Sequence, residues 1–163
     1  MLIAGFLKAD YVHVYKKCKM KPLHYFLVFV QFGGIFFFIL SGKVTPENAY
    51  VTVFEIFSVV LALWAYLVMK KHTFTVMPGV RENAQLCTTG PYRIIRHPMY
   101  TSVLILLLAL LVNEFSILRA IVFAVVLVNL IFKISVEEKI LRHKYAEYSD
   151  YEKNTWKIIP LIF

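Results

Sequence analysis

Long apolar stretches separated by polar breaks limit the folds that this chain can adopt. Leu23–Leu40 contains only two strongly polar side chains, His24 and Gln31, and Val51–Met69 is interrupted by a single carboxylate. About 20 mostly apolar residues in a helix cross the hydrocarbon core of a bilayer, so both stretches predict membrane spans. Ser41-Gly42-Lys43 is a helix-stop signal after the first stretch.

Two further apolar stretches, Pro98–Val112 and Ile117–Ile134, are joined by the short connection Asn113-Glu114. At 1.5 Å per residue the former reaches only about 22 Å, so one of its ends should lie inside the bilayer boundary. Of the 163 residues 60% are apolar, counting tyrosine, and only 17% are charged, which excludes a water-soluble or disordered chain. The predicted fold is one all-α domain over residues 1–163, an integral membrane bundle of four transmembrane helices.

The two ends of the chain differ from these spans. In residues 1–20 the apolar side chains Ile3, Leu7, Tyr11 and Val14 fall on one helical face, which predicts an amphipathic helix in the membrane interface. Residues 135–163 form a polar C-terminal segment.

Basic residues predict the orientation of the bundle. Of the 18 Lys and Arg residues, 16 flank the spans on one side, and only Lys43 and Arg119 fall on the other. Cytoplasmic flanks collect such residues, so both termini and the long loop between the second and third spans are expected in the cytoplasm. This corresponds to the plasma or inner membrane of a prokaryote, or to the endoplasmic reticulum of a eukaryote. The net charge of +8 favours contact with anionic lipids over nucleic acid, because no aromatic–basic module accompanies it.

Two polar segments adjoin the apolar helices, Gly90–Tyr100 and Glu137–Trp156. The third and fourth spans form a hairpin, so the start of one and the end of the other meet at the same membrane face. Glu137 and Glu138 should therefore approach His97 and Tyr100. We predict a site there with carboxylates, a histidine, arginines and aromatic faces, covered by residues 135–163.

S-adenosylmethionine fits such a site. Carboxylates would offset its sulfonium and ammonium groups, and aromatic faces would stack on its adenine. Pro98 is favourable at the first position of a helix, and free amides of Met99 and Tyr100 are expected to receive an anion or a ring nitrogen. Methyl transfer to an acceptor that is already an anion needs little acid–base help, so positioning and desolvation would supply much of the catalysis.

The same residues carry a resemblance to a known family. Gln85–Tyr100, the pair Glu137-Glu138, Glu147–Tyr151 and Ile159-Pro160 occur in an order that resembles the isoprenylcysteine carboxyl methyltransferases and their prokaryotic relatives. The resemblance implies an integral membrane enzyme that binds S-adenosylmethionine at the cytoplasmic face and takes a lipophilic or prenylated acceptor from the bilayer. By position, the cofactor contacts implied are Gln85, Leu86, Cys87, Tyr92, His97, Pro98, Met99, Tyr100, Glu137 and Glu138.

The acceptor is assigned to two basic residues, Arg96 and Lys133. The family usually has an arginine one helical turn before the acidic pair, where this chain has Lys133, which lacks the bidentate fork of arginine. Ser102 stands where many members have glycine. The N-terminal part is short beside members with more helices, so the substrate tunnel either differs or is completed by a second subunit in a homodimer.

Other functions remain open from the sequence. The nearest alternative is a phospholipid amine N-methyltransferase, and a sterol-type reductase fits less well because it would need NADPH contacts and usually more helices. A non-catalytic membrane scaffold or a small transporter is the alternative outside the enzymes. No metal site is predicted, because the five histidines lack ligand spacing, and no Walker loop or dinucleotide fingerprint occurs.

Some polar and small residues have structural interpretations. Gln31 and Asn129 are expected to form hydrogen bonds between helices, and Gly33-Gly34 to permit close helix contact. Cys18 and Cys87 both fall on the predicted cytoplasmic side and are expected to be free thiols, and Glu138 and Arg142 could form an ordinary helix-surface ion pair.

Overall fold

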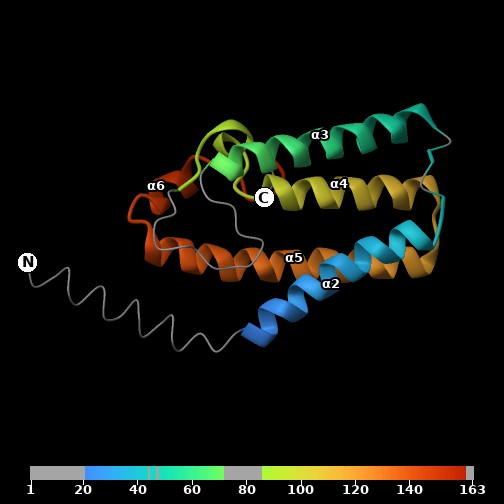
Figure 1. The fold of residues 1–163 in the computed structure, drawn as a ribbon, viewed down its shortest axis with the longest axis horizontal. Helices are drawn as coiled ribbons and strands as arrows, with labels where there is room; N and C mark the ends of the chain where they lie inside the picture. The colour runs from blue at the N-terminus through green and yellow to red at the C-terminus, as the bar shows by residue number, and fades with distance from the viewer. Residues whose placement is uncertain (1–20, 44, 47, 72–85, 161–163) are drawn as a thin grey trace, which may run out of the picture.

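The computed structural model describes residues 21–43, 45–46, 48–71 and 86–160, and over these ranges it is a bundle of antiparallel helices (Figure 1). The predicted interfacial helix over residues 1–20 and the site residue Gln85 lie outside the described residues. Two short helices, η1 and α6, lie at the same end of the bundle, which we call the site end. The helices are α2 (Lys21–Leu40), α3 (Ala49–Lys71), η1 (Gly90–Arg93), α4 (Pro98–Asn113), α5 (Ile117–Lys144) and α6 (Tyr148–Lys153).

The long helices pack in two pairs, α3 along α4 and α2 across α5 (Figure 1). Phe38 of α2, Leu107 of α4 and Leu130 of α5 join them in one buried apolar cluster, and Ile158 from the C-terminal segment adds to it. Many large apolar side chains point outward instead, as Phe29 does with 74% of its surface exposed. An outward apolar surface is what acyl chains would cover.

Within the described part of the chain, three helices are long and apolar enough to cross a membrane, at Pro22–Leu40, Ala49–Lys70 and Ile117–Lys144. The fourth apolar helix, α4, has 16 residues and is about 24 Å long. It falls short of the hydrocarbon thickness, as its sequence indicated. The predicted helix ends at Leu40 and near Val112 agree with the structure, which supports three to four spans.

The helix that contains the predicted fourth span extends beyond it. The span was predicted to end at about Ile134, where apolar residues give way to polar ones. Helix α5 continues for ten more residues to Lys144 and is about 42 Å long. Nothing between Ile134 and Lys144 breaks a helix, since the segment contains neither glycine nor proline. The acidic pair Glu137-Glu138 therefore lies on a helix that is continuous with the apolar part.

Gly34 and Asn129 lie at the contact between α2 and α5. A Cβ atom on Gly34 would overlap Val126 Cγ2, whereas one on Gly33 would meet nothing within 4 Å among the described residues. The predicted close helix contact at Gly33-Gly34 is thus confirmed, and Gly34 is the residue that makes it. Asn129 donates a hydrogen bond of 3.0 Å to the carbonyl oxygen of Leu27, which confirms its predicted role between helices.

The end of the bundle opposite the site end is held by Glu114. Its Oε2 atom accepts a hydrogen bond of 2.7 Å from the amide of Lys43 and lies 3.5 Å from the guanidinium of Arg119. Ser116 caps α5 there by accepting from the Arg119 amide. The two basic residues that the charge pattern separated from the other 16 therefore do lie together, away from the site end.

Candidate active site at the ends of α4 and α5

The site begins at the first residues of α4. Pro98 occupies the first helical position, where the absence of an N–H group costs nothing, and His97 is the N-cap residue. The backbone carbonyl of His97 accepts hydrogen bonds from the amides of Tyr100, at 3.0 Å, and Thr101. The expectation of a free Tyr100 amide is therefore wrong, because that amide closes the first turn.

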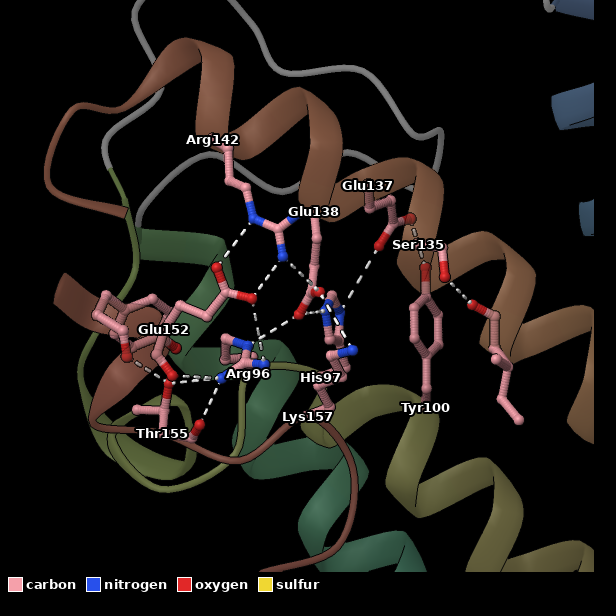
Figure 2. Close-up of polar contacts among 12 residues, drawn as sticks. Arg96, His97, Tyr100, Ser135, Glu137, Glu138, Arg142, Glu152, Thr155 and Lys157 are labelled. Carbon is pink, nitrogen blue, oxygen red and sulfur yellow. Dashed lines mark hydrogen bonds and ion pairs between the residues drawn. The ribbon is translucent and has the colours of Figure 1, made fainter. Parts of the chain in front are cut away.

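The imidazole of His97 lies between the two carboxylates of α5 (Figure 2). Its Nδ1 atom is 3.7 Å from Glu137 Oε2, and its Nε2 atom is 3.5 Å from Glu138 Oε1. The ring stacks on Tyr100, with centroids 5.6 Å apart and planes 9° from parallel. The predicted approach of the acidic pair to His97 and Tyr100 is present.

Glu138 is surrounded by cationic groups. Its carboxylate accepts from Arg96 Nε at 2.8 Å, and the guanidinium of Arg142 and the ammonium of Lys157 lie 3.6 Å and 3.9 Å away (Figure 2). With His97, four side chains from three segments converge on one carboxylate whose side chain is 3% exposed. The predicted Glu138–Arg142 pair is present, but it is one contact of several. Glu138 is therefore a buried link between α5, the start of α4 and the C-terminal segment.

Arg96 connects α5 to the C-terminal segment. Besides Glu138 it binds the carbonyl oxygen of Glu152, at 3.0 Å, and both the carbonyl and the hydroxyl of Thr155 (Figure 2). Arg142 makes a second link, with two hydrogen bonds to the Glu152 carboxylate. The hydrogen bonds from Arg142 hold the pKa of Glu152 below its usual range.

Backbone pairing fixes the same segment on both sides of Arg96. Ile95 and Trp156 form an isolated parallel bridge, and the amides of Arg96 and His97 donate to the carbonyls of Trp156, at 2.7 Å, and Lys157. Residues 154–158 thus lie against the connection between η1 and α4. We name Glu152–Ile158 the C-terminal strap.

Glu137 differs from Glu138 in its exposure and in its partners. Its Oε1 atom accepts a hydrogen bond of 2.6 Å from the hydroxyl of Tyr100, and its side chain is 19% exposed (Figure 2). One helical turn earlier, the ammonium of Lys133 lies 4.9 Å from the centre of the Tyr100 ring. Tyr100 therefore touches a carboxylate at its hydroxyl and a cation at its face.

The remaining predicted residues form a second cluster against α3. Cys87 and Tyr92 are buried together with Ala65, and Met99 packs against them. Burial raises the pKa of the Cys87 thiol, and burial likewise raises the pKa of Tyr92. Leu86, next to Cys87, is half-buried. This cluster joins the acidic pair through Met99 and Tyr100, which are neighbours on α4.

Several site residues were not predicted from the sequence. The strap contacts made by Glu152, Thr155 and Lys157 use backbone carbonyls or side chains on a loop, and residue types alone give little signal for them. Gln31 was predicted to bond between helices, which is confirmed, and its partner proves to be Lys133.

Among the described residues, no group of three or more His, Cys, Asp and Glu side chains is placed to hold a metal ion.

Comparison with known proteins supports the resemblance. No curated protein matches the chain. A sequence model of the family described as phospholipid methyltransferase matches residues 48–148, which is 101 of the 163 residues and runs from the start of α3 to the start of α6. The chain therefore belongs to the phospholipid methyltransferase family of membrane methyltransferases.

Proposed function

We propose that this protein transfers a methyl group from S-adenosylmethionine to a lipophilic acceptor with an acidic headgroup, at the site end of the bundle. The family supports methyl transfer. The charges around Tyr100 support the choice of acceptor. The favoured acceptor is the carboxylate of a prenylated thiol or a similar amphiphile.

The donor set fits the cofactor. Glu137 is the carboxylate with exposed surface, so it is assigned to the sulfonium or the ammonium group. His97, Tyr92 and Tyr100 are the aromatic rings at this end of the bundle that are assigned to contacts with the adenine. Glu138 is enclosed by three cationic side chains and by His97, and it is assigned as a positioning residue, which keeps His97 and Arg96 in place.

The roles of the two basic residues also separate. The guanidinium of Arg96 donates its hydrogen bonds to Glu138 and to the strap. We therefore assign Arg96 to holding the strap in position, in place of the role toward the acceptor that its sequence suggested. Lys133 is buried on α5, with an ammonium that lies over Tyr100 and a neutral amide as its hydrogen-bond partner. We assign Lys133 to the acidic headgroup of the acceptor.

Bound S-adenosylmethionine supplies an electrophilic methyl group on sulfur. The residues of the chain would hold and desolvate the two reactants. Glu137 would offset the cationic part of the cofactor, and Lys133 would offset the negative charge of the acceptor. A carboxylate acceptor needs no base, and burial at the helix ends excludes water from the pair.

The charge balance supports a carboxylate acceptor. Lys133 and Glu137 carry opposite charges, and the cofactor would bring one net positive charge, so a carboxylate acceptor would leave the site neutral. A protonated amine has no lone pair to attack the methyl group, so an amine acceptor would first have to lose a proton to a base, which a carboxylate need not do. The excess of basic residues near this end supports a cytoplasmic site with both termini in the cytoplasm.

The observation that carries the proposal is the partly exposed carboxylate of Glu137 bound to Tyr100. Calorimetric titration of the purified protein with S-adenosylhomocysteine tests it. We expect micromolar binding that weakens by about tenfold in Glu137→Gln, the loss of roughly one charge-assisted contact. Asp150→Asn, at a carboxylate 81% exposed on α6, is the matched control and should bind normally. No binding to the wild-type protein at millimolar concentration would favour a scaffold or transporter.

A second candidate is N-methylation of a phospholipid amine, which the description of the matched family favours. Incubation with labelled S-adenosylmethionine and a lipid extract distinguishes the two. Base-labile methyl esters in the products would support the acidic acceptor, and base-stable label in an amine headgroup would support the phospholipid.

A further inference from the structure

Helix α2 supplies a polar side chain to the buried part of the site. Lys133 donates a hydrogen bond of 3.0 Å to Gln31 Oε1, and both residues are buried, with 3% and 7% of their surfaces exposed. Gln31 precedes the region matched by the family, which starts at residue 48. Lys133 lies inside the matched region, and its hydrogen-bond partner Gln31 lies outside it.

The partner of this ammonium is a neutral amide. A carboxylate at the position of Gln31 would cancel the charge of Lys133, whereas an amide accepts one hydrogen bond and leaves the charge in place. The neighbouring carboxylate of Glu137 accepts its hydrogen bond from the hydroxyl of Tyr100 and is the group assigned to the cationic part of the cofactor. The ammonium lies 4.9 Å from the centre of that ring and has donor hydrogens beyond the one that Gln31 accepts.

The position of Gln31 is independently fixed. Asn129 bonds to the Leu27 carbonyl on the same pair of helices, and Gly34 packs directly on Val126. These contacts hold α2 against α5 without any help from the Gln31–Lys133 bond. That bond is therefore not needed to join the helices, and its specific effect is to orient the lysine.

We infer that Gln31 is a positioning and specificity residue, which holds the Lys133 ammonium over Tyr100 so that its charge faces an anionic headgroup entering from the bilayer. The inference rests on the proposed function, since it concerns the acceptor side of the same site. It assigns the discrimination between acidic and amine headgroups partly to α2.

Binding of simple amphiphiles tests this inference without knowledge of the natural acceptor. The protein is reconstituted in nanodiscs of zwitterionic lipid, and labelled dodecanoate is titrated by equilibrium dialysis, with binding to empty nanodiscs subtracted. Dodecylamine has the same chain length with the opposite charge and serves as the comparison ligand. We expect saturable binding of dodecanoate at least about tenfold tighter than that of dodecylamine, and its loss in Lys133→Met.

Two substitutions of Gln31 separate orientation from packing. Gln31→Leu should weaken dodecanoate binding about tenfold. Gln31→Glu keeps the shape and the hydrogen bond but cancels the charge, so it should abolish the preference for dodecanoate. Asn129→Leu, which removes the other buried α2–α5 hydrogen bond, is the control and should keep the preference.

Wild-type affinity for dodecanoate in Gln31→Glu, or equal losses in Gln31→Leu and Asn129→Leu, would overturn the inference. Titration with S-adenosylhomocysteine in each variant keeps this result separate from the proposed function. Normal cofactor binding with no headgroup preference would reject the role of Gln31 alone, while absent cofactor binding in the wild-type protein would reject the proposed function.

Discussion

Removal of Arg96 should release the C-terminal strap before it unfolds the bundle. Its guanidinium joins Glu138, Glu152 and Thr155, so Arg96→Ala leaves a buried carboxylate and two carbonyls without this donor. Loss of one partner from a buried ion pair costs about 3–5 kcal/mol. Glu138 keeps two other cationic neighbours and its contact with His97, so we expect the lower value of about 3 kcal/mol, or roughly a hundredfold in the opening equilibrium.

Hydrogen exchange of the purified protein in detergent measures this opening directly. Three amides report on the strap, those of residue 96, His97 and Trp156. The amide of residue 96 donates to the carbonyl of Trp156, and that of His97 donates to the carbonyl of Lys157. The amide of Trp156 donates in turn to the carbonyl of Ile94. Their protection should fall by about the same hundredfold, while amides in the middle of α5 keep theirs. Arg96→Lys should give an intermediate loss, since one ammonium cannot span both sides. Arg93→Ala, at an exposed arginine three residues earlier, is the control.

Unchanged protection of the Trp156 amide in Arg96→Ala would refute this reasoning. It would mean that the backbone pairing alone holds the strap. A uniform loss across α5 would refute it as well, because the arginine would then stabilise the whole bundle.

Two further predictions concern packing and reactivity. Gly34→Ala should lower the free energy of unfolding by about 1–3 kcal/mol, because the added Cβ would overlap Val126. Gly33→Ala should leave the free energy of unfolding unchanged or raise it slightly. Equal thermal unfolding temperatures for the two variants in detergent would contradict the contact at Gly34. In a Cys18→Ser background, Cys87 should react with iodoacetamide much more slowly in the native protein than after denaturation. Since burial raises the pKa of its thiol, the native rate should keep increasing at pH values where a free thiol has levelled off; a native rate that levels with the free thiol would show that Cys87 is accessible.

The sequence predicted the helices better than it predicted where one of them ends. Apolar stretches with clear stop signals located α2, α3 and α4 to within two residues. The end of α5 was missed because a fall in hydropathy marks the edge of a membrane, not the end of a helix. Helix propensity, which continues to Lys144, decides the latter.

The site was predicted in part for a similar reason. The hairpin of α4 and α5 follows from a short connection, and it brings Glu137 and Glu138 to His97 without further information. The strap could not be derived in this way, because Arg96 binds backbone carbonyls that every residue possesses. That Gln31 would bond to another helix followed from its depth in an apolar stretch, but the choice of Lys133 depends on how α2 crosses α5.

The unbroken course of α5 has a consequence for how the proposed enzyme could change its substrate. Lys133 and Glu137, which we assign to the acceptor and to the cofactor, are one turn apart on a single helix, so any shift or rotation of that helix moves both together. In the proposed site, the alignment between donor and acceptor would therefore be protected against changes in bilayer thickness or helix tilt. New acceptors would have to be accommodated by residues on neighbouring helices, and α5 itself would stay as it is.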